Sequence, residues 1–140
     1  MWSGCIFFAS SYVKLQDAYA AESNQLGTWQ LIGYTAPGTK ANSNEYSTTV
    51  FKYTGAMTDK ASLEKTTTQD NAWKAEALAA LNDCNKASTW VLKVTGNTNG
   101  VTYENTITNA SKGSASDCTA LTPNFTNIGT KAASTTGQGG

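Results

Sequence analysis

The three cysteines are the residues of this chain whose possible chemistry is easiest to define. They stand at positions 5, 84 and 118, with no Cys-x-x-Cys pair. Cys84 and Cys118 both lie in the polar, strand-rich half, where a disulfide would close a loop of about 34 residues and contribute about 3–4 kcal/mol. We predict this disulfide, and with it an oxidising compartment. Two unrelated buried thiols are the alternative, a metal site is disfavoured without histidine or close spacing, and Cys5 is left single.

The residue types that are missing restrict catalysis. The chain has ten lysines and ten acidic residues but neither arginine nor histidine. Without histidine, serine–histidine and cysteine–histidine catalysis and histidine-bearing zinc sites are excluded. Acidic pairs such as Asp59/Glu64 and Asp70/Glu76 are better explained as solvated loop charges than as paired catalytic carboxylates. We therefore expect no enzyme, no cofactor and no metal.

The composition describes a polar surface with few charges. Thr, Ser and Asn supply 46 of the 140 residues, and charged residues are 14%, below the roughly 25% that is usual for soluble domains. The formal net charge of zero provides no basic field that would attract nucleic acid. This composition is typical of an extracellular, strand-rich protein, and no nucleic-acid partner is expected.

The two ends of the chain differ from the rest. The apolar run in the first ten residues is about five long, too short for a signal peptide, which needs roughly seven to fifteen, and for a membrane span. We interpret residues 1–10 as an atypical or artificial start. Residues 130–140, rich in Gly, Ser, Thr and Ala, are predicted to be a disordered tail. The expected organisation is thus a single domain over 1–129.

The elements that must position these residues begin with a helix, expected over residues 6–23. Large apolar side chains recur at steps of four, three and four positions and form one packing face: Phe8, Tyr12, Leu15 and Tyr19. Polar residues, including Gln16 and Asp17, fill the opposite side. The turn-rich segment 24–44 is expected to be a loop packed down by its own aromatic side chains.

The remainder of the chain indicates strands. One is expected over 46–53. Segments 89–95 and 101–107 alternate apolar and polar residues around an Asn/Gly-rich turn, which is the pattern of a β-hairpin. Residues 57–70 are expected to be a loop. Residues 72–81 fit a helix by their alanine content and a strand by their strict alternation, and periodicity does not decide between the two.

Together these elements predict an α+β fold. One N-terminal amphipathic helix would pack on the face of an antiparallel sheet that carries Trp90, Leu92 and Val94, and the disulfide would bound the C-terminal region. In this plan residues 121–128 are an edge strand or an ordered coil, since Pro123 is unsuited to a central strand.

Three aromatic residues are candidates for a binding function: Trp29, Tyr34 and Trp73. On a surface with few charges, exposed aromatic rings could stack on sugar rings. A secreted carbohydrate-binding module, with a polysaccharide or a cell surface as its partner, is therefore one hypothesis. The other interpretation is that the tryptophans fill a small core, and their apolar neighbours favour it.

Several stretches of the chain resemble the type IV pilin-like proteins of bacteria, which include the pseudopilins. Residues 12–22 and 27–38 resemble the helix and the following loop of that family. Short segments together with Trp90 and Cys118 resemble its sheet and C-terminal disulfide region: 51–54, 73–75, 81–84 and 121–127. The resemblance covers about 8–129. It implies a headpiece with half a helix, a variable loop, an antiparallel sheet and a disulfide-bounded C-terminal region, and it favours a strand for 72–81.

The family also has features without a counterpart in this sequence. Its prepilin leader and its long apolar N-terminal helix are not matched, so no assembly glutamate or processing site is carried over. The chain would thus be a headpiece alone, reaching a membrane only through the missing helix. The resemblance implies a structural subunit of a type IV pilus or of a type II secretion-like filament, located outside a bacterial cell, with other pilin subunits as partners.

Overall fold

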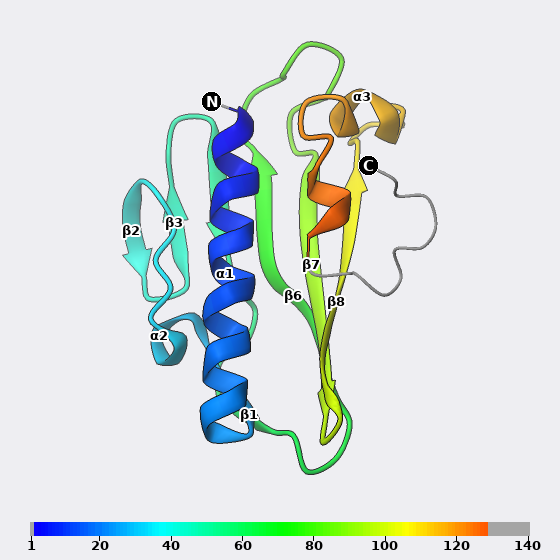
Figure 1. Ribbon diagram of the computed structural model, residues 1–140. Coiled ribbons are helices and arrows are strands. Elements are labelled where there is room, and N and C mark those ends of the chain that lie inside the picture. The colour runs from blue at the N-terminus through cyan, green and yellow to red at the C-terminus, as the bar shows by residue number, and fades with distance from the viewer. Residues whose placement is uncertain (1, 129–140) are drawn as a thin grey trace.

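A computed structural model describes residues 2–128 of the chain, in which one long helix lies across one face of an antiparallel sheet (Figure 1). The helices are α1 (Trp2–Ser23), α2 (Trp29–Ile32), α3 (Ala115–Thr119) and the 3₁₀-helix η1 (Phe125–Asn127). The strands are β1 (Gln25–Leu26), β2 (Thr39–Asn42), β3 (Glu45–Ser47), β4 (Phe51–Thr54), β5 (Ala61–Ser62), β6 (Thr67–Ala77), β7 (Thr89–Asn97) and β8 (Gly100–Thr108). The predicted α+β class with an antiparallel sheet is confirmed. The predicted tail over 130–140 lies outside the described residues.

Helix α1 begins four residues earlier than the predicted start at residue 6 and ends at Ser23, as predicted. Its buried side consists of residues at helical spacing: Ala9, Tyr12, Val13, Gln16 and Ala20. Of the predicted packing face, Tyr12 is fully buried. The other three members are partly buried: Phe8, Leu15 and Tyr19. The stripe that faces the core is therefore rotated towards Val13 and Gln16, and the expectation that Gln16 lies on the polar side is wrong.

Gln16 is buried because the loop after α1 supplies partners for its amide group. Its Oε1 accepts a hydrogen bond from the Gly27 N–H at 2.8 Å. Its Nε2 donates to the Gly27 carbonyl and to the Tyr12 hydroxyl, both at 3.0 Å. A Cβ at position 27 would lie 2.8 Å from the ring of Tyr19 and 2.9 Å from Cγ2 of Ile32, so any larger residue would displace these side chains. This contact between an amide side chain and one peptide unit fixes the direction in which the chain leaves the helix.

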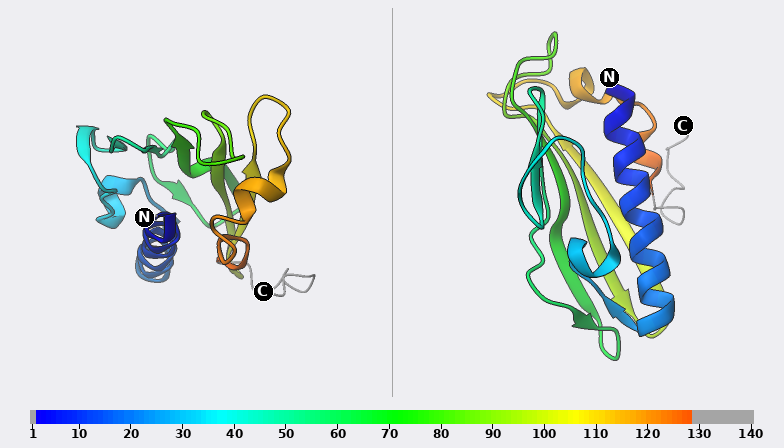
Figure 2. Two further views of the ribbon diagram at one scale, coloured as in Figure 1. Left: turned by 90° about the horizontal axis from the view of Figure 1, so that it is seen from above. Right: turned by 90° about the vertical axis from the view of Figure 1, so that its left-hand side faces the viewer.

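The large sheet contains six strands in the order β2-β3-β4-β6-β7-β8, and every neighbouring pair is antiparallel. Strands β1 and β5 pair with each other in a separate two-stranded sheet. Strands β7 and β8 form the predicted hairpin, which is closed by the pair Asn97 and Gly100. Figure 2 shows that α1 covers one face of the large sheet, while no described helix lies on the opposite face.

The single strand expected over 46–53 is instead a hairpin of β3 and β4. Thr48 ends the first strand because its Oγ1 accepts hydrogen bonds from the N–H groups of Val50 and Phe51, at 3.1 and 3.0 Å. A hydroxyl that binds nearby backbone N–H groups in this way competes with the extended ladder. No glycine or proline marks this turn, so the sequence between β3 and β4 has the same residue types as a continuous strand.

The segment 72–81 is a strand up to Ala77, as the resemblance favoured, and it belongs to β6. Pairing with β4 on one side and β7 on the other overrides the helix propensity of its alanines. The loop expected over 57–70 is wrong in two places, since Ala61–Ser62 form β5 and β6 already begins at Thr67. The two parts of β6 are joined by a bulge between Gln69 and Trp73, where Asn71 has a φ of 54°.

The C-terminal segment 121–128 is the ordered coil of the two alternatives, with η1 in its middle. It lies on the same side of the sheet as α1 (Figure 1). Phe125 is fully buried and anchors the segment in the core, 6.1 Å from the ring of Trp73. Pro123 is exposed at the turn that precedes η1.

Three tryptophans occupy the core, and each indole N–H has a hydrogen-bond acceptor. The pairs are Trp29 with the Ala72 carbonyl (3.0 Å), Trp73 with the Tyr34 hydroxyl (2.9 Å) and Trp90 with the Thr122 hydroxyl (2.7 Å). Burial of these large rings supplies much of the hydrophobic driving force, while the N–H bonds avoid the penalty of an unpaired buried donor. The core is thus aromatic and still fully paired at these donors.

Candidate functional site

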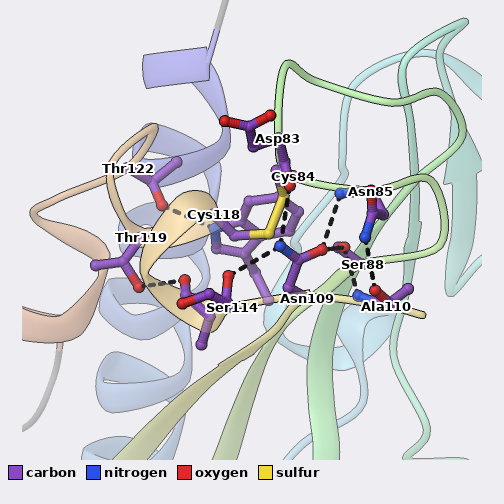
Figure 3. The surroundings of a disulfide bond; sticks show 12 residues. Asp83, Cys84, Asn85, Ser88, Asn109, Ala110, Ser114, Cys118, Thr119 and Thr122 are labelled. Carbon is purple, nitrogen blue, oxygen red and sulfur yellow. Dashed lines mark hydrogen bonds between the residues drawn. A yellow bond between two sulfur atoms is a disulfide. The ribbon is translucent and has the colours of Figure 1, made fainter. Parts of the chain in front are cut away.

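Cys84 and Cys118 form the predicted disulfide, which joins the loop between β6 and β7 to helix α3 (Figure 3). The Cα atoms are 4.8 Å apart, and both residues are fully buried. Leu81 and Cys84 exchange two backbone hydrogen bonds, of 2.7 and 3.0 Å, which hold the loop close to the bridge. The disulfide therefore ties the chain after β8 to the end of the sheet. Cys5 lies in α1.

Asn109 directly follows β8 and gathers the segments around the disulfide (Figure 3). Its Oδ1 accepts hydrogen bonds from the Asn85 N–H at 2.9 Å and from the Ser88 hydroxyl at 3.0 Å. Its Nδ2 donates to the carbonyls of Asp83 and Ser114, at 3.1 and 2.8 Å. The amide therefore uses both donors and both acceptor positions. One side chain thus fixes the loop before β7 against the segment that leads into α3.

The disulfide and the hydrogen bonds of Asn109 have a structural role, and we call them the brace and this part of the molecule the braced end. Both thiols are consumed by the bridge, so neither is available as a thiolate nucleophile or metal ligand. Within residues 2–128, no group of three or more His, Cys, Asp or Glu side chains is placed to hold a metal ion. The amide and hydroxyl groups that remain bind one another and the backbone. The arrangement holds three chain segments in fixed positions: the loop between β6 and β7, the end of β8, and the segment that leads into α3.

The three aromatic candidates for sugar stacking do lie together, but inside the core. Trp29 and Tyr34 are each 2% exposed, and Trp73 is 0% exposed. The rings of Trp29 and Tyr34 meet edge-on, with centroids 4.7 Å apart. No ring face of these residues is open to a sugar, so their assignment as stacking residues is wrong. Between residues 8 and 128, the only exposed large apolar side chain is Leu31.

A polar contact joins α1 to β8 through Asp17 and Tyr103. The Tyr103 hydroxyl donates a hydrogen bond to Asp17 Oδ1 at 2.7 Å. Burial raises the pKa of Tyr103, and the hydrogen bond to Asp17 and the charge of Asp17 raise it further. Burial also raises the pKa of Tyr12, whose ring centroid is 6.5 Å from that of Tyr103. Both phenols therefore stay protonated at neutral pH, where they do not act as bases.

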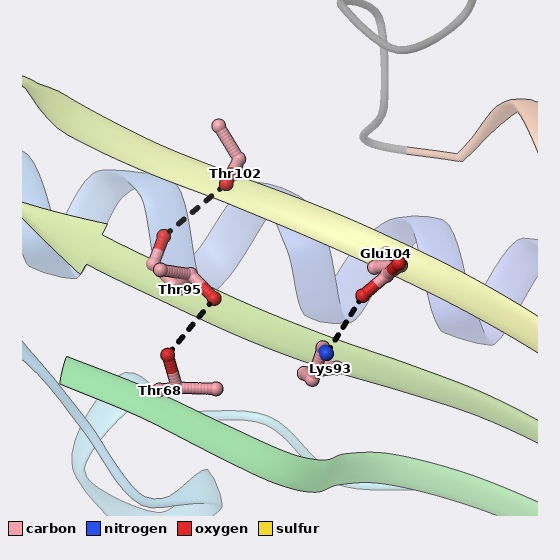
Figure 4. A network of polar contacts seen from close by, with 5 residues as sticks. All are labelled: Thr68, Lys93, Thr95, Thr102 and Glu104. Carbon is pink, nitrogen blue, oxygen red and sulfur yellow. Dashed lines mark hydrogen bonds and ion pairs between the residues drawn. The ribbon is translucent and has the colours of Figure 1, made fainter.

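The sheet face opposite α1 carries threonine, lysine and glutamate side chains (Figure 4). Lys93 on β7 and Glu104 on β8 face each other, with Nζ and Oε1 2.8 Å apart. The hydrogen bond to Glu104 raises the pKa of Lys93. Thr95 lies between Thr68, at an Oγ1–Oγ1 distance of 3.2 Å, and Thr102 on β8. Exposed ion pairs of this kind add little stability. We therefore interpret this face as a polar, solvent-exposed surface of the sheet.

Comparison with known proteins adds no assignment. No protein-family model, curated protein or solved structure matches this chain. Within residues 2–128, no helix combines the length and the hydropathy that crossing a membrane requires. The interpretation of the molecule therefore rests on its geometry and on its sequence.

The residues that sequence reasoning missed are the two buried amides, Gln16 and Asn109. Asn109 is one of twelve asparagines in a chain rich in Thr, Ser and Asn, so its type and position carry no signal of burial. Gln16 has a weak signal, because it lies one turn after Tyr12 and would share its face. Both become visible only when the segments that supply their partners are placed in space.

Proposed function

We propose that this chain is the headpiece of an extracellular filament subunit of the type IV pilin or pseudopilin kind. Its role is structural, and its partners are other subunits of the filament. The observation that carries the proposal is the arrangement of a long helix on one face of an antiparallel sheet whose C-terminal segment is tied back by a disulfide. These are the parts of the chain in which the sequence resembles that family.

Fixed attachment of α1 to the sheet supports this role. The amide of Gln16 holds the loop after the helix at Gly27, and Asp17 holds β8 through Tyr103. A subunit that transmits load through its helix needs the helix and the sheet to move as one body. These two neighbouring helix residues connect α1 to two different parts of the headpiece.

The charge of the chain also supports a repetitive assembly. The formal net charge is zero, and charged residues make up only 14% of the chain. Many copies placed side by side therefore repel one another little over long distances. The Thr-rich face opposite α1 keeps the outside polar without long-range repulsion.

Immunogold labelling of cells that produce the chain tests the proposal. Antibodies raised against the purified chain should label filaments along their length outside the cell. Filaments sheared from these cells should contain the chain with Cys84 and Cys118 bonded, as measured by mass spectrometry after thiol blocking. Deletion of the gene should remove the labelled filaments. Recovery of the chain as a free secreted monomer, or inside the cell with both thiols reduced, would contradict the proposal.

A pair of variants separates a structural requirement from a general loss of expression. Replacing Cys84 and Cys118 by serine removes the brace and should lower filament yield strongly. Asn124→Ala changes an exposed residue near the same end and should leave filament yield unchanged. Equal filament yields from the two variants would contradict a structural role for the braced end.

A further inference from the structure

The two edges of the six-stranded sheet differ in how well they are protected against pairing with another strand. Strand β2 has four residues and a bulge between Lys40 and Asn42. Short length, a bulge and a lysine are features that discourage strand addition. Strand β8, at the opposite edge, has nine residues, pairs with β7 without a bulge and contains neither proline nor lysine. Figure 4 shows it as the outermost strand.

The hairpin geometry determines which backbone groups of β8 point outward. A two-residue loop separates Asn97 from Gly100, and the pair that closes such a loop is joined by hydrogen bonds. Even-numbered residues of β8 therefore direct their N–H and C=O groups to β7. The residues that direct these groups away from the sheet are Val101, Tyr103, Asn105 and Ile107. Within residues 2–128, no other segment bonds to these backbone groups.

The sequence of β8 is nearly symmetric about Glu104. From the centre outward, the related pairs are Tyr103 with Asn105, Thr102 with Thr106, and Val101 with Ile107. If two antiparallel copies of β8 met about a two-fold axis at Glu104, every outward-pointing residue would face another outward-pointing residue. The apolar and partly buried Val101 and Ile107 would then face each other, and threonine would face threonine, as cross-strand pairing favours.

We propose that β8 is an interface for a second copy of this chain, which pairs with it antiparallel about a two-fold axis at Glu104. The two six-stranded sheets then become one continuous sheet, with both α1 helices on the same face. The second copy supplies hydrogen-bond partners for the four outward-pointing residues of β8. Because a two-fold contact closes on itself, this pairing goes beyond the filament contacts proposed above and can fail independently of them.

The register has one unfavourable contact, which makes it testable. Glu104 faces Glu104 of the second copy, and each carboxylate is partly neutralised by Lys93 of its own chain at 2.8 Å. Like charges directly opposite each other weaken strand pairing. Glu104→Gln is therefore expected to lower the dimer dissociation constant several-fold in sedimentation equilibrium. An increase of that constant would contradict the register.

Disulfide trapping tests the register directly. Glu104→Cys places a thiol on the axis, opposite the same residue of the second copy, at a pair whose side chains are close enough for a disulfide. Thr102→Cys, on the same exposed face, would face Thr106 instead and is the matched control. Both variants also carry Cys5→Ser, so that the new thiol is the free one. We expect Glu104→Cys to form covalent dimers at least ten times faster in non-reducing electrophoresis. Equal rates, or no dimer from Glu104→Cys, would overturn the proposal.

A charge exchange tests the same register without a new thiol. Ile107→Lys places a charge against Val101 of the second copy and should weaken the dimer at least tenfold in sedimentation equilibrium. Adding Val101→Glu to that variant should restore it, because opposite charges then face each other. Circular dichroism verifies that each variant is folded. Absence of the rescue in folded protein, or a wild-type chain that stays monomeric at the highest soluble concentration, would overturn the proposal.

Discussion

Two buried amides hold two ends of the molecule, and they do so under different constraints. Gln16 binds the peptide of Gly27, 11 residues further along the chain, with no covalent link nearby. Asn109 joins three segments beside a disulfide that spans 34 residues. Closing the longer loop costs about 1 kcal/mol more in chain entropy. The contact between Gln16 and Gly27, which are close in sequence, is thus held by hydrogen bonds alone. The contact between the loop before β7 and the C-terminal segment, which are far apart in sequence, has a covalent bond as well.

Of the changes that test this comparison, removal of the disulfide is expected to lower the free energy of unfolding most. Replacing both Cys84 and Cys118 by alanine should lower the free energy of unfolding by about 3–4 kcal/mol, because the unfolded chain is no longer restricted. Urea unfolding followed by tryptophan fluorescence measures this loss. A loss below about 1 kcal/mol would show that hydrogen bonds hold this end nearly as well without the bridge.

Asn109→Ala should follow, with a loss of about 3 kcal/mol, because it removes the hydrogen-bond partner of four groups at this end, among them the hydroxyl of the buried Ser88. Asn109→Asp is the matched variant, since it keeps the oxygen that accepts two hydrogen bonds but sets a second carboxylate oxygen against the carbonyls of Asp83 and Ser114. We expect the aspartate variant to be no more stable than the alanine variant in urea unfolding, because the two oxygens repel the carbonyls that the amide bound. If the alanine variant is as stable as the wild type, the amide does not organise this end.

Gln16→Ala should cost about 2 kcal/mol, less than the change at Asn109, since it frees only the peptide of Gly27 and the Tyr12 hydroxyl. Gln30→Ala, at an exposed position of α2, should be close to neutral in the same urea experiment. A larger loss at Gln16 than at Asn109 would reverse the comparison. The contact between α1 and the loop at Gly27 would then contribute more to stability than the contacts of Asn109.

Alkaline pH should weaken the contact between Tyr103 on β8 and Asp17 on α1. The expected loss of stability is smaller than for the substitutions above. The pKa of Tyr103 in the folded chain is raised above its ordinary value of about 10. Its contribution to stability is therefore fully present below pH 10 and is lost as the pH rises above it, because the unfolded chain releases the phenolic proton first. The urea midpoint of the wild type should fall above about pH 10.

Tyr103→Phe is the control for this pH dependence. It should cost about 1 kcal/mol at neutral pH through loss of the bond to Asp17, and it should make the decline above pH 10 shallower. Some decline should remain, because the pKa of Tyr12 is raised as well. Identical slopes for the two proteins would contradict a contribution from Tyr103.

Periodicity was sufficient for the parts of the fold in which one pattern dominates. The alternation on either side of Asn97 and Gly100 predicted the β7–β8 hairpin, and the apolar stripe predicted α1. It failed where a polar side chain finds buried partners, as Gln16 does, and where a hydroxyl ends a strand, as at Thr48. Neither event changes the apolar pattern, so neither is visible in it.

The disulfide could be predicted from the sequence, whereas its surroundings could not. Two cysteines in a strand-rich half leave few pairings, but the partners of Asn109 come from segments up to 26 residues away. The aromatic residues show the same limit. In the sequence, Trp29 and Trp73 are aromatic residues that could belong to a sugar-binding surface. Only the packing of α2 against β6 shows that their rings are buried.

The three buried indoles give the molecule its own set of optical reporters. Trp29 donates its N–H to β6, Trp73 donates to the loop before β2, and Trp90 donates to the C-terminal segment. Indole emission shifts when such a donor loses its partner and meets water. Variants that keep one of these tryptophans and also replace Trp2, the fourth in the chain, would thus report separately on three contacts of the fold. Emission from Trp90 would show when the C-terminal segment leaves the sheet.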